Sequence, residues 1–161
     1  MMTNQRLALI VALLAAAATA TSFFAQYVLL LNPCPLCILQ RVAVIGTLLV
    51  ALFCLCLPKR TPAFLARILM SVPAVWGLAV AVYQLWLQAL PAGERPSCGA
   101  PWTFRLRDYP LFEHWEFVVR GFGDCGVKEY LLGLSLPTWS VLMFGCILLI
   151  VWGSALMKDK H

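Results

Sequence analysis

Four apolar stretches, each long enough to cross a bilayer, constrain the fold of this chain more than any other feature of its sequence. They cover 7–31, 38–57, 68–90 and 134–157, and the second is interrupted only by Gln40 and Arg41. A helix needs about 20 apolar residues to span the hydrocarbon layer, where a helix satisfies all of its own backbone polar groups. The sequence therefore predicts an all-α integral membrane protein with a bundle of four transmembrane helices.

The composition agrees with lipid as the main solvent. Of the 161 residues, 62% are hydrophobic and 12% are charged, whereas soluble domains have about 45–50% apolar and about 25% charged residues. We expect a single membrane domain over 1–161. Arg6, the apolar run and Ala18-Thr19-Ala20 also resemble a cleavable signal peptide, but the run continues to Leu31, which favours an intact first span.

Charged residues are distributed unevenly between the connections. One side would carry six basic residues and one acidic residue, namely Arg6, Lys59, Arg60, Arg67, Lys158, Asp159 and Lys160. The other side would hold a short turn, 32–37, and a long loop, 91–133, with five basic and six acidic residues. Because Lys and Arg are enriched in cytoplasmic loops, we expect both termini in the cytoplasm and both connections outside it. The net charge of +5 reflects this topology and does not indicate nucleic-acid binding.

The seven cysteines fall into two groups. Four lie in the outward connections: Cys34, Cys37, Cys98 and Cys125. An even set in an oxidising compartment is typical of disulfides. The other three, Cys54, Cys56 and Cys146, lie in apolar sequence, where we expect small buried hydrophobic side chains. The membrane runs contain no histidine, so a histidine-ligated haem has little support.

The first cysteine pair, Cys34-Pro35-Leu36-Cys37, lies where the second apolar run begins. Pro35 suits the first position of a helix, which predicts Cys34 as the N-cap and Cys37 in the first turn. Free amide groups and the helix dipole favour a thiolate there. Arg41 follows Cys37 by four residues, so both project from one face. This cation would stabilise a thiolate and attract an electron-rich oxygen, unless it extends to the headgroups instead.

The second pair lies in segments rich in glycine and proline, around Cys98 and Cys125. A bridge between them would be a structural staple or a partner in thiol–disulfide exchange, and the local sequence leaves both open. Between them, 111–122 places four apolar residues on one helical face: Leu111, Trp115, Val118 and Phe122. This predicts a short amphipathic helix on the membrane surface, with packing on the bundle as the alternative.

The combined motifs resemble the DsbB family of inner-membrane disulfide bond formation proteins of Gram-negative bacteria. The resemblance rests on Cys34-Pro35-Leu36-Cys37 with Arg41, on Pro110-Leu111 and Trp115, on Gly123-Asp124-Cys125, and on the segment 133–139 that opens the fourth span. It covers about 7–157 and implies a quinone-dependent thiol oxidase. The implied partner is a DsbA-like periplasmic thioredoxin-fold protein, and the implied cofactor is ubiquinone or menaquinone, without metal or haem.

The resemblance also implies residue roles. The reduced partner would attack Cys98, whose companion is Cys125. Cys34 would exchange with Cys125, and Cys37 would face the quinone. Arg41 would polarise a quinone oxygen. Gln84 would bind the cofactor at a position where many family members carry histidine.

Three departures from the family pattern accompany these roles. Gln84 replaces the usual histidine, and Gln40 replaces a frequent glutamate beside the arginine. The segment 125–133 is one residue short, with Tyr130 near the usual tryptophan.

Two other functions remain compatible with the residues. One is a structural membrane subunit stapled by two periplasmic disulfides. The other is a zinc site built from the four outward cysteines, since four-cysteine tetrahedral sites are common. An oxidising compartment and the nearby Arg41 argue against the zinc site.

Overall fold

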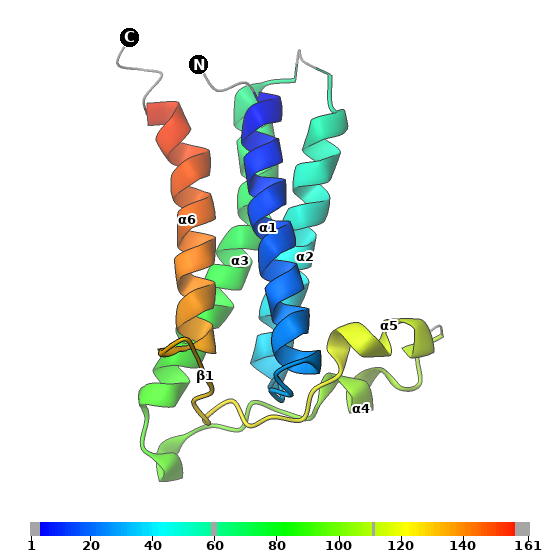
Figure 1. Ribbon diagram of the computed structural model, residues 1–161, viewed down its shortest axis with the longest axis vertical. Helices are drawn as coiled ribbons and strands as arrows, with labels where there is room; N and C mark the ends of the chain where they lie inside the picture. Colours follow the sequence, from blue (N-terminus) through cyan, green and yellow to red (C-terminus); the bar gives the residue numbers. More distant parts are fainter. Residues whose placement is uncertain (1–3, 59–60, 111, 157–161) are drawn as a thin grey trace.

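The computed structural model describes residues 4–58, 61–110 and 112–156. Its four long helices are α1 (Asn4–Tyr27), α2 (Pro35–Cys56), α3 (Ala63–Ala89) and α6 (Leu136–Leu156). They lie side by side as a bundle, and all four contain stretches long and apolar enough to cross a membrane (Figure 1). This confirms the predicted four-span membrane fold, although Met157 lies outside the described residues.

The first span ends earlier than its apolar run. We expected 7–31, whereas α1 ends at Tyr27. Leu30 adopts a positive φ of 55°, and the Leu31 amide donates back to the carbonyl of Ala25 at 3.1 Å. The chain thus turns before Pro33, because hydropathy marks the residues that tolerate lipid and does not mark where the helical backbone stops.

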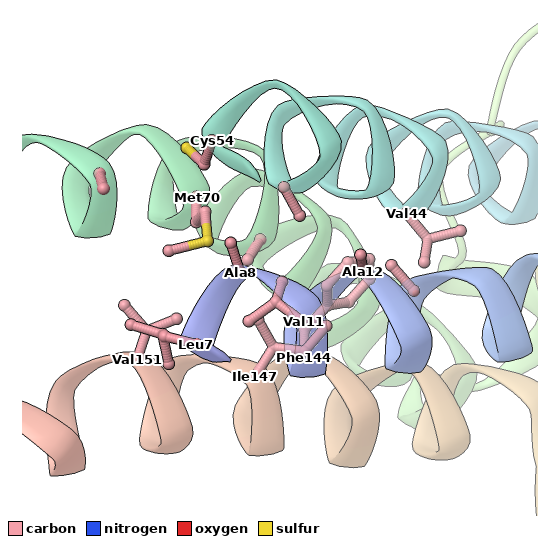
Figure 2. Packing of buried hydrophobic residues seen from close by; sticks show 14 of the residues in the cluster. Leu7, Ala8, Val11, Ala12, Val44, Cys54, Met70, Phe144, Ile147 and Val151 are labelled. Carbon is pink, nitrogen blue, oxygen red and sulfur yellow. The ribbon is translucent and has the colours of Figure 1, made fainter. Parts of the chain in front are cut away.

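Small side chains let the helices of the bundle approach closely, as they commonly do in membranes. Ala8 and Ala12 of α1 are buried beside Phe144 of α6 (Figure 2). The Phe144 ring fills the space over Gly77 of α3, where a Cβ atom would overlap it. The core therefore combines small side chains at close helix contacts with a few large ones such as Phe144 and Met70, and many other large apolar side chains are exposed on the outside of the bundle.

The chain between α3 and α6 contains only short elements. These are a 3₁₀ turn (Ala92–Glu94), α4 (Trp102–Leu106), α5 (Phe112–Val119) and two paired antiparallel strands, β1 (Tyr130–Leu131) and β2 (Leu134–Ser135). This segment and the α1–α2 turn lie together at one end of the bundle, and the start of α1 and the end of α6 lie at the other (Figure 1). The two connections that carry the outward cysteines therefore meet at one end.

The helix expected over 111–122 is shorter than its apolar pattern. Leu111 lies outside the described residues, and Phe122 belongs to the irregular chain that follows α5. Phe117 packs against Phe23 of α1 with ring centroids 6.0 Å apart, while Trp115 and Phe122 are exposed. The helix packs on the bundle and also presents aromatic side chains outward, and its contact with a membrane surface stays a prediction.

Candidate redox site

The first cysteine pair lies at the N-terminus of α2, as predicted. Cys34 is the N-cap, Pro35 takes the first helical position, and the Cys34 sulfur accepts the Cys37 amide at 3.2 Å. The two Sγ atoms are 2.7 Å apart, and both residues are free thiols. The hydrogen bond with Cys37 and burial raise the pKa of the Cys34 thiol. Cys34 therefore gives up its proton less readily than an ordinary thiol.

Gln84 of α3 contacts both sulfurs. Its side chain is 2% exposed, and its Nε2 lies 3.3 Å from the sulfurs of Cys34 and Cys37. Its Oε1 accepts from Gln40 Nε2 at 2.7 Å, which fixes the direction of the amide. The structure places Gln84 against the thiols, where its N–H groups favour a negatively charged sulfur. Its expected part in cofactor binding stays a prediction.

Arg41 is buried and does not extend to the surface; its exposed fraction is 4%. Its Nε donates to Ser22 Oγ at 2.9 Å, and its Nη1 donates to Gln26 Oε1 and, at 3.1 Å, to the Val118 carbonyl. The guanidinium also lies 4.7 Å from the ring centroid of Phe23. Arg41 thus joins α1, α2 and α5 directly beneath the first cysteine pair.

A cavity of about 560 Å³ opens beside this pair. Cys37, Gln40, Arg41 and Glu129 contribute its polar groups near the thiols. The rest of its wall is mainly apolar and comes from α1 and α6, including Leu14, Ala18, Leu142, Met143, Phe144 and Cys146. Gln84 is not among the lining residues. The cavity can therefore hold an apolar molecule whose polar end reaches Cys37 and Arg41.

Sequence reasoning missed Ser22, Gln26 and Glu129. Ser22 and Gln26 are four residues apart inside the first apolar run, so they share a helical face. Two such polar residues in a membrane helix are a usable sign of a buried polar partner. Glu129 gave no local signal, because only the strand pairing after it brings its side chain to the cavity.

The second pair is bonded. Cys98 and Cys125 form a disulfide with Cα atoms 6.2 Å apart. Cys125 is 2% exposed, whereas Cys98 is half-buried. An incoming thiolate therefore reaches Cys98 more easily than Cys125. Because these two cysteines bond to each other, a four-cysteine zinc site is not assembled in this arrangement.

The Cys125 segment lies alongside the turn that contains Cys34. The Gly123 amide donates to the Pro33 carbonyl at 3.2 Å, and the Phe122 amide donates to Asn32 Oδ1 at 3.1 Å. The fold thus brings Cys125, although it is distant in sequence, to the neighbourhood of Cys34. On the other side, Trp102 Nε1 of α4 donates to the Pro35 carbonyl at 3.1 Å, which lays α4 over the start of α2.

The remaining cysteines divide by position. Cys54 is buried, as expected, but Cys56 and Cys146 are exposed. The expectation was wrong for these two because their helix faces point away from the core. Cys146 also lines the cavity, far along the chain from Cys37.

Known proteins share this chain's sequence over most of its length. The family model for disulfide bond formation protein DsbB matches residues 4–153. Disulfide bond formation protein B of Neisseria meningitidis serogroup B is 54% identical over 137 residues, which cover 84% of this chain and 85% of that protein. The protein of the same name from Chromobacterium violaceum is 40% identical over 152 residues, or 93% of this chain and 90% of that protein.

A third relative covers almost the entire chain. Disulfide bond formation protein B of Marinobacter nauticus is 40% identical over 162 aligned residues, or 99% of this chain and 95% of that protein. Both cysteine pairs, the first three long helices and most of α6 fall within the residues that the family model matches. This chain belongs to the DsbB family and is a multi-pass membrane thiol oxidase that generates disulfide bonds.

Proposed function

We propose that the Cys98–Cys125 pair oxidises a DsbA-like periplasmic thioredoxin-fold protein, and that the Cys34–Cys37 pair passes the electrons to ubiquinone or menaquinone. In this proposal the chain lies in the bacterial inner membrane with both termini cytoplasmic and both pairs periplasmic. One observation carries it: Cys37 and Arg41 line an apolar cavity, while Cys34 lies beside the Cys125 segment. The first pair therefore borders both the cavity and the segment that carries Cys125.

The cavity suits a quinone. Its volume of about 560 Å³ lies within the range of about 300–1,000 Å³ for small-molecule sites, and its walls between α1 and α6 are mainly apolar. Arg41 makes four hydrogen bonds within the described chain, and a guanidinium has five N–H groups. One N–H thus remains for a quinone oxygen. A bound quinone would supply a two-electron, two-proton acceptor.

The first exchange begins at Cys98, the more accessible sulfur of the second pair. A thiolate of the partner attacks the Cys98 Sγ, a bond forms between the two proteins, and the Cys98–Cys125 bond breaks. Cys125 leaves with the electron pair as a thiolate. Because Cys125 is buried, it stays inside the protein and faces the first pair rather than the partner.

The second exchange transfers the charge to the cavity. When the first pair is oxidised, the Cys125 thiolate attacks the Cys34 Sγ, and Cys37 leaves as a thiolate. The Cys37 sulfur lies where the Gln84 amide points, so the leaving group is stabilised as it forms. The partner's second thiol then attacks the mixed disulfide and leaves with its own disulfide formed, which releases Cys98 as a thiolate. Cys98 attacks the Cys125 Sγ, so the Cys98–Cys125 bond forms again, the Cys34–Cys125 bond breaks, and Cys34 and Cys37 are both reduced. Closing the Cys34–Cys37 bond then gives up two electrons and two protons, and the cavity beside Cys37 is where an acceptor would collect them.

The experiment combines purified protein, a soluble quinone and a reduced thioredoxin-fold dithiol, and follows the oxidation of the dithiol and the reduction of the quinone. Oxidation of the dithiol should require quinone, and reduction of the quinone should require the dithiol. Both reactions should cease in Cys37→Ser. Cys146→Ser removes another cavity thiol and is the matched control, so it should retain turnover. Unchanged turnover in Cys37→Ser contradicts the proposal, and disulfides that resist the dithiol would identify a structural staple.

A further inference from the structure

Gln84 and Gln88 lie one turn apart on α3, and each holds a segment from a different cysteine pair. Gln84 Nε2 lies 3.3 Å from the Cys34 sulfur. Gln88 Nε2 donates to the carbonyls of Cys125 at 3.3 Å and Val127 at 3.1 Å. Residues four apart face the same side of a helix and are separated by about 6 Å along its axis. One face of α3 therefore presents Cys34 and the Cys125 segment to each other.

A second, smaller pocket lies between the first pair and the segment that carries Cys125. Its lining includes Cys34, Gln84, Gln88 and Asp124. Close packing continues beyond it, since a Cβ atom on Gly123 would meet the main-chain nitrogen of Cys34 at 3.2 Å. Cys125 follows only two residues later. Disulfide bonds need Cα atoms about 4.4–6.8 Å apart, so a segment held in place beside Cys34 favours a bridge between the pairs.

Stability alone does not explain the Gln88 side chain. Gln88 is 3% exposed, and its Oε1 is buried without a hydrogen-bond partner among the described residues. An unpaired buried acceptor lowers the stability of the folded state, and an apolar side chain of similar shape avoids that cost. What the amide adds is its N–H group, which fixes the main chain at Cys125 and Val127.

We propose that Gln88 is a positioning residue for the disulfide exchange between the two cysteine pairs. It holds the Cys125 segment against α3, one turn from the place where Gln84 holds Cys34. This inference rests on the proposed function, in which the Cys125 thiolate attacks the Cys34 Sγ. The Cys34–Cys125 bond forms as the Cys34–Cys37 bond breaks, and the electron pair and negative charge leave on Cys37. The step needs no proton and no external oxidant.

The first test measures how readily the bridge forms, without quinone or partner protein. In a Cys37→Ser, Cys98→Ser background, Cys34 and Cys125 are the remaining cysteines of the two pairs. The protein is equilibrated with a glutathione redox buffer, and the Cys34–Cys125 bridge is quantified by mass spectrometry of peptides. Gln88→Met, of similar shape, should lower the ratio of bridged to open protein about tenfold, the size expected for the lost hydrogen bonds. Ala89→Leu, at the exposed neighbouring position, should leave it unchanged.

A second measurement, the closure of the Cys98–Cys125 bridge, distinguishes a positioning role of Gln88 from a general effect on folding. In a Cys34→Ser, Cys37→Ser background, Gln88→Met should change the closure of the Cys98–Cys125 bridge less than twofold. Gln88→His keeps a side-chain N–H donor and should restore part of the Cys34–Cys125 bridge. An unchanged Cys34–Cys125 ratio overturns the inference, and so does an equal fall for both bridges. Neither measurement depends on quinone, so a failure of the proposed function would be recognised separately in the turnover experiment.

Discussion

Cys34 and Cys37 lie three residues apart at the start of a long helix, whereas Cys98 and Cys125 come from distant parts of a loop and meet through their own bond. The first pair is surrounded by side chains that act on sulfur, namely the amide of Gln84 and the cation of Arg41 nearby. The second pair is surrounded by main-chain contacts that hold its segments in place. The two pairs are therefore supported by different kinds of interaction.

This difference matches the demands of the proposed reactions. A pair that meets a rigid apolar cavity needs a fixed geometry and a stabilised thiolate, which a helix N-terminus supplies. A pair that meets a protein partner needs an accessible sulfur, and Cys98 is the more accessible of the second pair, in chain without regular secondary structure. Arg41 and Arg95 illustrate the contrast: Arg41 lines the cavity, while Arg95 binds the carbonyls of Leu90 and Gly126 beside the second pair.

The largest expected effect comes from removing the outer sulfur. Cys98→Ser should lower oxidation of a thioredoxin-fold dithiol by more than about 10³-fold, because it removes the sulfur at which the proposed exchange starts. The Cys34–Cys37 pair should still reduce a quinone when it is first reduced chemically. The two rates are measured separately, by stopped-flow for the dithiol and by absorbance for the quinone. If Cys98→Ser abolishes both rates, the second pair does not act on the dithiol alone and the proposed separation of roles is wrong.

The two arginines give the next effect. Arg41→Leu should lower kcat/KM for quinone about 10- to 100-fold, because one charge-assisted hydrogen bond at the cavity is worth that much. Arg95→Leu should leave quinone use nearly unchanged and slow the attack on Cys98, since it frees the Gly126 segment. Initial rates at varied quinone and varied dithiol separate the two parameters.

Arg41→Lys controls for folding in this comparison. It keeps the positive charge but loses the planar fork that binds Ser22 and Gln26 together. We expect a folded protein with a quinone defect intermediate between wild type and Arg41→Leu. If the Arg41 and Arg95 variants lower the rate with the same substrate, quinone or dithiol, by the same factor, the assignment of one arginine to each pair is wrong.

Gln84 gives a smaller effect confined to the first pair. Gln84→Leu removes two N–H contacts with sulfur, so at fixed pH the reduced Cys37 should react with a thiol-directed alkylating reagent about tenfold more slowly. Cleavage of the Cys98–Cys125 bond by a dithiol should keep its rate. Gln84→His retains an N–H donor and should recover much of the Cys37 reactivity. If Gln84→Leu leaves the alkylation rate unchanged, Gln84 does not stabilise the Cys37 thiolate.

Residues whose role is local were the ones that sequence reasoning placed correctly. The cap at Cys34, the first-turn position of Cys37 and the shared face with Arg41 follow from Pro35 and helical spacing alone. The four spans follow from hydropathy. These features depend on neighbours within one or two helical turns, so a sequence pattern is enough to predict them.

Residues whose role depends on long-range packing were harder to place. The sequence did not predict the contact of Gln84 with the two thiols, because the rotation of α3 against α2 decides what it meets. Its expected role at the cofactor stays a prediction. The binding of Arg41 to the Val118 carbonyl depends on where α5 docks. Glu129 reaches the cavity only through the strand pairing that follows it. A pattern within one segment does not encode these distances.

Glu129, which lines the cavity beside the first pair, supplies the smallest expected effect. Burial raises the pKa of its carboxyl, and a main-chain hydrogen bond at Asn32 partly opposes this. The folded protein then binds more protons than the unfolded chain between the ordinary pKa of a glutamate and the raised one, so stability falls as the pH rises through that window. Glu129→Gln removes the charge and should flatten this decline.

The thermal unfolding midpoint, measured in detergent across that pH range, tests the claim. Glu129→Gln and wild type should unfold at the same temperature at the acidic end, and the variant should become the more stable by a few degrees as the pH rises. Glu94→Gln, at an exposed carboxyl in the segment leading to Cys98, should match wild type throughout. A constant offset for Glu129→Gln would mean that the substitution changes packing, since only loss of a titrating charge makes the difference grow with pH.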